Sequence, residues 1–202
     1  MALSNYGELK TAIADFLNRD DVDVTASGFI ALAEAQIARD IKHWKQERRV
    51  TLSLDERFEE VPTDWLETLN MYLDDGTPIE YASVAEISRR KLLQNDTAGK
   101  PVVYTMNSGQ FEFYPAPDET YNLTMIYRAR IPVLAQDDDY TWLLTDYPDI
   151  YLYGSLLHTA PYLQEDQRLA TWAQLYAAAV KQVNSESQAA KYSGAPLVMR
   201  NV

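Results

Sequence analysis

The spacing of apolar residues predicts helices in the N-terminal part of the chain. Apolar positions recur three or four residues apart, as on one face of an α-helix. The first predicted helix follows a cap at Ser4 or Asn5 and buries Tyr6, Leu9, Ile13 and Phe16 or Leu17. The second follows a cap at Thr25 or Ser27, continues to the basic segment Lys42–Lys45, and buries Phe29, Leu32, Ile37 and Ile41. Each helix is apolar on one side only and therefore needs a partner.

The stretch from Trp142 to Val183 is predicted to form two further helices, with a break near 161–165. These two helices are the expected packing partners of the N-terminal pair. The first begins at Tyr147–Pro148, because proline suits the first helical position. Its apolar face carries Ile150, Tyr153, Gly154 and Leu157. The second presents a stripe of Leu169, Trp172, Ala173, Tyr176, Val180 and Val183.

Between these helical ends the apolar period changes to two, which predicts strands. The predicted strands include Val50–Leu54, Leu69–Leu73 and, after the turn Asp74-Asp75-Gly76, a returning strand at Pro78–Tyr81. Two helical pieces interrupt them: a short turn at Thr63–Leu66 and a helix from Ser83 to about Gln94 with a capping box. A hairpin over Val102–Phe113 is followed by Tyr121–Tyr127 as the third strand of a meander.

This order predicts an α+β protein: an antiparallel helical bundle built from the N- and C-terminal helices, with a β-rich insertion between them. We expect the bundle at 1–47 and 136–192, the insertion at 48–135, and an extended tail at 193–202. Gly194 and Pro196 end any helix before the tail. Two interpretations of the tail stay open, namely a free end or an extended segment that docks on a neighbouring chain.

Composition narrows the possible functions. The chain has 202 residues, no cysteine and a net charge of −12. The lack of cysteine removes disulfides, thiol catalysis and cysteine-ligated metals, and the acidity makes general nucleic-acid binding unfavourable. No apolar run is long enough for a membrane span and no signal peptide is recognised, so we expect no membrane association. Fourteen tyrosines are an unusually large share of the aromatic residues, which is typical of interfaces.

The sequence contains no pattern typical of catalysis or of a metal site. It has no phosphate-binding glycine loop, nucleophile elbow or zinc-protease motif. The only histidines, His43 and His158, lie far apart in the sequence and are more typical of structural side chains than of a metal site. The acidic runs Asp20–Asp23 and Asp137–Asp139 lack the other residues of a calcium loop and are interpreted as solvated loops. We therefore expect neither cofactor nor metal.

Several stretches together resemble the head-to-tail adaptor proteins of tailed bacteriophages, of the short-tailed type that binds beneath the portal ring. No single motif is unique, and the resemblance lies in the series and covers nearly the full chain. The stretches are Leu9–Arg19, Phe29–Asp40, Val61–Leu66, Gly76–Tyr81, Gly99–Pro101 and Pro148–Gly154.

The resemblance implies a non-enzymatic virion protein at the head–tail junction, assembled in the host cytoplasm. It implies a homo-oligomeric ring, usually a dodecamer, bound to the portal protein and to tail, nozzle or tail-fibre proteins, with DNA passing through the lumen during genome ejection. It also implies a terminal extension that binds the portal, which here places that role on Pro196, Leu197, Val198, Met199, Arg200 and Val202. The tyrosine-rich side of the C-terminal helices predicts a subunit interface at Tyr151, Tyr153, Tyr162 and Tyr176.

Two alternatives from other classes stay open. One is a virion-associated peptidoglycan hydrolase that uses paired carboxylates, for which Glu59 and Glu60 beside Trp65 are the candidates. Adjacent strand residues point to opposite faces, which argues against that pair. The other is a soluble adaptor module unrelated to phage.

Overall fold

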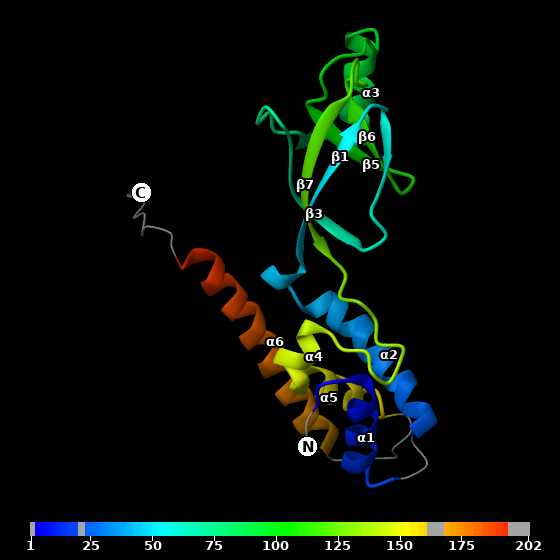
Figure 1. The fold of residues 1–202 in the computed structure, drawn as a ribbon, viewed down its shortest axis with the longest axis vertical. Coiled ribbons are helices and arrows are strands. Elements are labelled where there is room, and N and C mark those ends of the chain that lie inside the picture. The colour runs from blue at the N-terminus through cyan, green and yellow to red at the C-terminus, as the bar shows by residue number, and fades with distance from the viewer. Residues whose placement is uncertain (1–2, 20–22, 161–167, 194–202) are drawn as a thin grey trace. The chain divides into compact units, whose positions relative to one another are not determined.

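The structure, a computed structural model, describes residues 3–19, 23–160 and 168–193 (Figure 1). It contains both helices and sheets, which confirms the predicted α+β class. The chain divides into two compact units. We call Met1–Lys45 together with Ile131–Val202 the helical unit, and Gln46–Arg130 the β unit. The predicted break at 161–165 and most of the predicted tail lie outside the described residues.

The helical unit contains helices from both ends of the chain. They are α1 (Tyr6–Leu17), α2 (Asp23–Asp40), α4 (Trp142–Asp146), α5 (Pro148–Leu157) and α6 (Arg168–Tyr192). Helix α5 starts at Pro148, as the sequence predicted, and packs against both α2 and α6. Its neighbours enclose it so closely that Tyr151, Leu152 and Ser155 are buried along with Ile150.

The acidic loop Asp137–Asp139 contacts the start of α1 through its backbone, while Asp137 and Asp138 are exposed, as the sequence predicted. Asn5 caps the helix by accepting a hydrogen bond from the backbone N–H of Glu8 at 2.8 Å. The backbone N–H groups of Tyr6 and Gly7 donate to the carbonyls of Asp139 and Asp137, each at 2.9 Å. Because a helix N-terminus favours negative charge, an acidic loop suits this place.

Helix α2 differs from the prediction in both length and orientation. It begins at Asp23, before the predicted caps, and ends at Asp40 instead of continuing to Lys45. The buried stripe is Ala26, Ile30, Ala33 and Ile37. Leu32, predicted to be buried, is 53% exposed, and Phe16 on α1 is exposed while Leu17 is buried. The predicted burial of Ile37 and Ile41 on this segment, and of Leu17 on α1, is confirmed. The prediction was wrong for Leu32, because alanines and not the largest side chains make the close contact.

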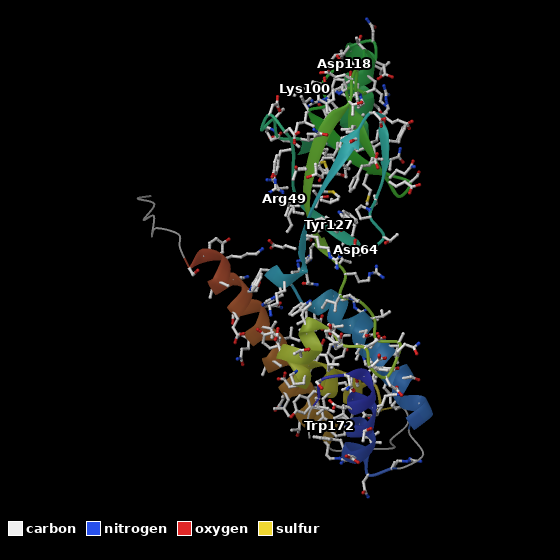
Figure 2. All side chains as sticks on the ribbon, viewed as in Figure 1. Arg49, Asp64, Lys100, Asp118, Tyr127 and Trp172 are labelled. Carbon is white, nitrogen blue, oxygen red and sulfur yellow. The ribbon has the colours of Figure 1, made fainter. Side chains whose placement is uncertain are left out.

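The contact at Gly154 explains why small residues are needed. A Cβ atom on Gly154 would lie 3.2 Å from Cε2 of Tyr176 on α6 and 3.5 Å from Cβ of Ala33 on α2. Three helices therefore meet at a residue without a side chain. On α6 the buried stripe is Trp172, Tyr176, Ala179, Val183 and Ser187. Ala173, which the sequence placed on the apolar stripe, is exposed. Trp172 lies in this core (Figure 2).

The β unit contains two sheets. The first is antiparallel and has the strand order β1-β7-β3, formed by β1 (Glu47–Leu54), β7 (Tyr121–Ala129) and β3 (Trp65–Leu73). The second has the order β2-β6-β5-β4, formed by β2 (Phe58–Glu60), β6 (Gln110–Tyr114), β5 (Val103–Asn107) and β4 (Glu80–Tyr81). Side chains from both sheets share one core, including Met71 and Met125 from the first and Phe111 and Phe113 from the second.

The predicted hairpin is confirmed as β5 and β6, and the predicted capping-box helix is confirmed as α3 (Val84–Leu93). The predicted meander is wrong, because β7 lies between β1 and β3 in the other sheet. Pro115 and Pro117 follow β6 at once, and proline cannot donate a hydrogen bond to a continuing ladder.

Two further predictions in this region were wrong. Instead of a helical turn over Thr63–Leu66, Thr63 and Asp64 form a turn, and Trp65 and Leu66 already belong to strand β3. Asp64, just before the strand, accepts a hydrogen bond from the hydroxyl of Tyr127 at 2.9 Å and thereby ties the start of β3 to β7 (Figure 2). The predicted returning strand Pro78–Tyr81 makes a single bridge between Pro78 and Tyr72, and β4 then pairs in parallel with β5.

Candidate docking surfaces

The structure places the tyrosines predicted for a subunit interface mainly inside the helical unit. Tyr151 is 1% exposed and accepts a hydrogen bond from the hydroxyl of Thr141 at 3.3 Å. Burial raises the pKa of Tyr151 to about 12. Tyr176 is 4% exposed, and its hydroxyl donates to Oδ2 of Asp40 at 2.9 Å. Burial, followed by the Asp40 carboxylate, raises the pKa of Tyr176 well above its ordinary value.

These two rings therefore offer almost no surface to a neighbouring subunit. Helix α5 has no second apolar side to present, because α2 and α6 both pack against it. Tyr153 is half-buried against the same core. Tyr162 lies outside the described residues, as do Pro196, Leu197, Val198, Met199, Arg200 and Val202 of the predicted docking tail.

The two histidines have separate structural surroundings. His43 is buried, and its ring stacks on Trp142 with centroids 4.9 Å apart. Burial lowers the pKa of His43, so the neutral ring is favoured. His158 instead lies 3.1 Å from Oε1 of Gln36, measured from its Nε2. Across the described ranges, no group of three or more histidine, aspartate and glutamate side chains is placed to hold a metal ion.

The His43 region also fastens the end of α2 to α6. The backbone N–H groups of Lys42 and Trp44 donate to the side chains of Asn184 at 2.8 Å and Ser187 at 2.9 Å. Lys45 adds an ion pair with Asp146 at 2.5 Å. The segment that follows α2 is therefore held by side chains of the helical unit.

The carboxylate pair suggested for a hydrolase does not converge on a common point. Glu59 and Glu60 are neighbours on β2, opposite Phe111 and Gln110 of β6, so their side chains point to opposite faces. Burial and then the nearby Asp55 raise the pKa of Glu59. Nothing in this arrangement brings a second carboxylate across a cleft from the first.

The most exposed apolar side chains of the β unit lie on α3. Leu92 and Leu93 are 83% and 72% exposed, and Val84 at the start of the helix is 46% exposed. The helix rests on the second sheet through Ile87, which is 1% exposed. We call Leu92 and Leu93 the α3 surface. Sequence reasoning missed it, although two leucines at the end of a short predicted helix were the available signal.

Two long helix faces of the helical unit are also exposed and nearly free of charge. On α6 the exposed residues opposite the buried stripe are Ala170, Gln174, Ala177, Ala178, Lys181, Ser185 and Gln188. On α2 the exposed residues opposite its buried stripe are Gly28, Ala31, Leu32, Ala35 and Arg39. We call these the α6 face and the α2 face.

Comparison with known proteins identifies the family of this chain. The family model described as SU10 adaptor protein matches residues 4–200. The chain belongs to the SU10 adaptor protein family. This confirms the resemblance to phage head-to-tail adaptors that the sequence suggested. No curated protein matches the chain.

Membership has direct consequences for the class of function. The adaptor family is structural rather than catalytic, so this adaptor is a virion protein that connects head and tail. The family implies interaction with portal and tail components. In the described part of the chain, no helix is both long and apolar enough to cross a membrane. Nothing supports the hydrolase alternative.

Proposed function

We propose that the adaptor forms a homo-oligomeric, dodecameric ring at the head–tail junction of a short-tailed phage. The ring binds the portal protein on one side and tail, nozzle or tail-fibre proteins on the other, and DNA passes through its lumen during ejection. The family match carries this proposal. We place its assembly in the host cytoplasm, before the virion is complete.

The charge of the chain supports a lumen that does not retain DNA. Each unit contains 15 acidic and nine basic residues, so both are equally acidic. Affinity for the phosphate backbone comes mainly from lysine and arginine. A ring built from either unit therefore carries an excess of negative charge, which favours passage of DNA over binding.

We assign the portal contact to the C-terminal residues Leu197–Val202. Four of these six residues are apolar, in a chain whose net charge is −12. Extended segments of this kind bind along a neighbouring surface through backbone hydrogen bonds and a few side-chain pockets.

Adding portal to the purified adaptor is expected to convert monomers or weak oligomers into rings seen by electron microscopy. Deletion of Leu197–Val202 is expected to weaken portal binding at least tenfold, because the apolar anchors are lost. Binding is measured by sedimentation with assembled portal. The change Val133→Asp is a matched control, since Val133 is an exposed apolar residue elsewhere in the helical unit. Portal without an added ring would contradict the proposed function, whereas rings with undiminished affinity after deletion would contradict only the role of the tail.

We assign the contact with the tail component to the α3 surface, because the adaptor family implies such a partner and this surface is the most exposed apolar one described in the β unit. Replacing Leu92 and Leu93 together by aspartate is expected to reduce binding of the tail component at least tenfold, since two carboxylates would be desolvated in the contact. Portal binding is expected to stay unchanged. Pull-down with the tail component, compared with Val133→Asp, measures the effect, and equal binding by both variants would rule out the α3 surface.

A further inference from the structure

The α6 face is unusual for an exposed helix of this protein. Charged residues make up 24% of the chain. From Ala170 to Gln188, about five helical turns, the α6 face carries Lys181 as its single charge. The other members are alanine, glutamine and serine, and Leu175 beside them is 41% exposed. Solvated helix faces are normally rich in charge, so this composition indicates a surface that becomes covered.

The α2 face shows the same composition and adds an independent observation at Gly28. A Cβ atom placed on Gly28 would meet nothing within 4 Å. No contact with the described residues of the helical unit therefore requires glycine here, although glycine in a helix interior costs about 1 kcal/mol relative to alanine. A second helix approaching from outside is the physical reason that remains, because a missing side chain lets two helix backbones come close.

The two faces lie on different sides of the helical unit. Helix α6 forms one edge of this unit and α2 the other, with α5 between them (Figure 1). Each exposed face is turned away from the buried stripe of its own helix. A contact between the α2 face of one copy and the α6 face of the next leaves one face of each type free at the ends. Such a head-to-tail contact forms a ring when its rotation closes and an open filament when it does not, and the proposed ring corresponds to the closed case.

We infer that neighbouring subunits pack with the α2 face of one copy against the α6 face of the next. This inference rests on the proposed ring and names its subunit interface. The small residues allow close helix packing, and Leu32 and Leu175 supply one exposed leucine on each side. This interface differs from the one predicted at Tyr151 and Tyr176, because the rings of these two residues are buried in the core of the helical unit.

The area of the contact agrees with assembly that depends on the portal. Helix α6 has 25 residues and is therefore about 37 Å long. The α2 face, Gly28–Arg39, is only about 18 Å long and limits the contact. With a contact strip ~10 Å wide, it offers about 180 Å² per partner, whereas a stable interface needs roughly 800 Å² per partner. The contact is too small to hold free subunits together, but it suffices between copies that the portal already places side by side.

The lack of cysteine in the chain allows a direct test by cross-linking. Ala35→Cys on the α2 face is combined in turn with Gln174→Cys, Ala177→Cys or Ser185→Cys on the α6 face, which covers three registers. Each full-length double variant is assembled on portal, treated with a bifunctional thiol reagent, and separated on a denaturing gel. We expect at least one double variant to give a ladder of dimers, trimers and higher species, while every single variant stays monomeric.

The outcomes separate the inference from the proposed function. Rings in the micrographs without a ladder from any double variant would overturn the inference alone. A strong dimer from a single variant would also overturn it, because it would indicate two identical faces in contact. The absence of rings in unmodified adaptor with portal would overturn the proposed function and the inference together.

A variant that keeps the fold gives a second readout. Gly28→Gln is expected to leave the unfolding midpoint unchanged or raise it, because its side chain has free space within the unit. Ring assembly on portal is expected to fall at least tenfold. Ala190→Gln is the matched control, since this exposed alanine of α6 lies half a turn away from the α6 face. Normal assembly of Gly28→Gln would overturn the inference.

Discussion

Replacing Tyr176 by alanine is expected to lower the free energy of unfolding of the isolated adaptor by about 4 kcal/mol, because a buried aromatic ring is removed from a close-packed core. The ring is 4% exposed, packs beside Gly154, and holds Asp40 through its hydroxyl. Loss of the ring leaves a cavity where α2, α5 and α6 meet. Denaturant unfolding followed by circular dichroism measures the change.

Two control variants make this result specific. Tyr176→Phe keeps the ring and loses only the hydrogen bond to Asp40, so we expect a cost of about 2 kcal/mol. Tyr192→Ala removes a tyrosine from the same helix that is 71% exposed, and its effect should stay below about 0.5 kcal/mol. If Tyr176→Ala left the isolated protein as stable as Tyr192→Ala does, Tyr176 would be free to act at a subunit interface, as the sequence suggested.

Replacing Lys91 by methionine is expected to destabilise the β unit by about 2 kcal/mol. Lys91 on α3 pairs with Glu112 on β6, whose side chain is only 5% exposed. Removing the lysine leaves the Glu112 carboxylate buried without its partner, and such an orphaned charge is costly. The 28% exposure of Lys91 moderates the effect, because water reaches part of the pair. Thermal unfolding monitored in the near ultraviolet follows the change.

The double variant Lys91→Met with Glu112→Met tests the reason for this cost. Because both charged groups are removed together, we expect it to recover most of the lost stability. An additive result, with the double variant less stable than either single one, would show that side-chain packing and not the ion pair links α3 to the sheet.

The features that the sequence predicted correctly depend on neighbouring residues. The hairpin of β5 and β6 follows from alternation around Asn107-Ser108-Gly109, where Ser108 and Gly109 adopt positive φ angles. The start of α3 follows from Ser83, whose hydroxyl accepts a hydrogen bond from the backbone N–H of Glu86 at 3.2 Å. The start of α5 follows from Pro148. In each case the local chemistry is sufficient.

The features that the sequence did not predict depend on partners far away in the chain. Strand β7 has the expected alternation, but its place between β1 and β3 is decided by pairing with residues that lie 50 to 81 positions earlier. The buried side of α2 includes Ala33, which lies beside Gly154, a residue more than 100 positions later in the chain. The candidate surfaces were missed for a related reason. The sequence alone does not show whether a given leucine or glycine is exposed or buried, because this depends on the tertiary structure.

The division of the chain into two units also sets an order of folding during synthesis. The β unit is one continuous segment, Gln46–Arg130, whereas the helical unit needs both ends of the chain. When α2 has left the ribosome, more than 100 residues separate it from α5, its main partner. At ~5–20 residues per second this delay lasts roughly 5–20 s. We therefore expect the β unit to fold first. The apolar stripes of α1 and α2 stay exposed to solvent until the C-terminal helices have been synthesised.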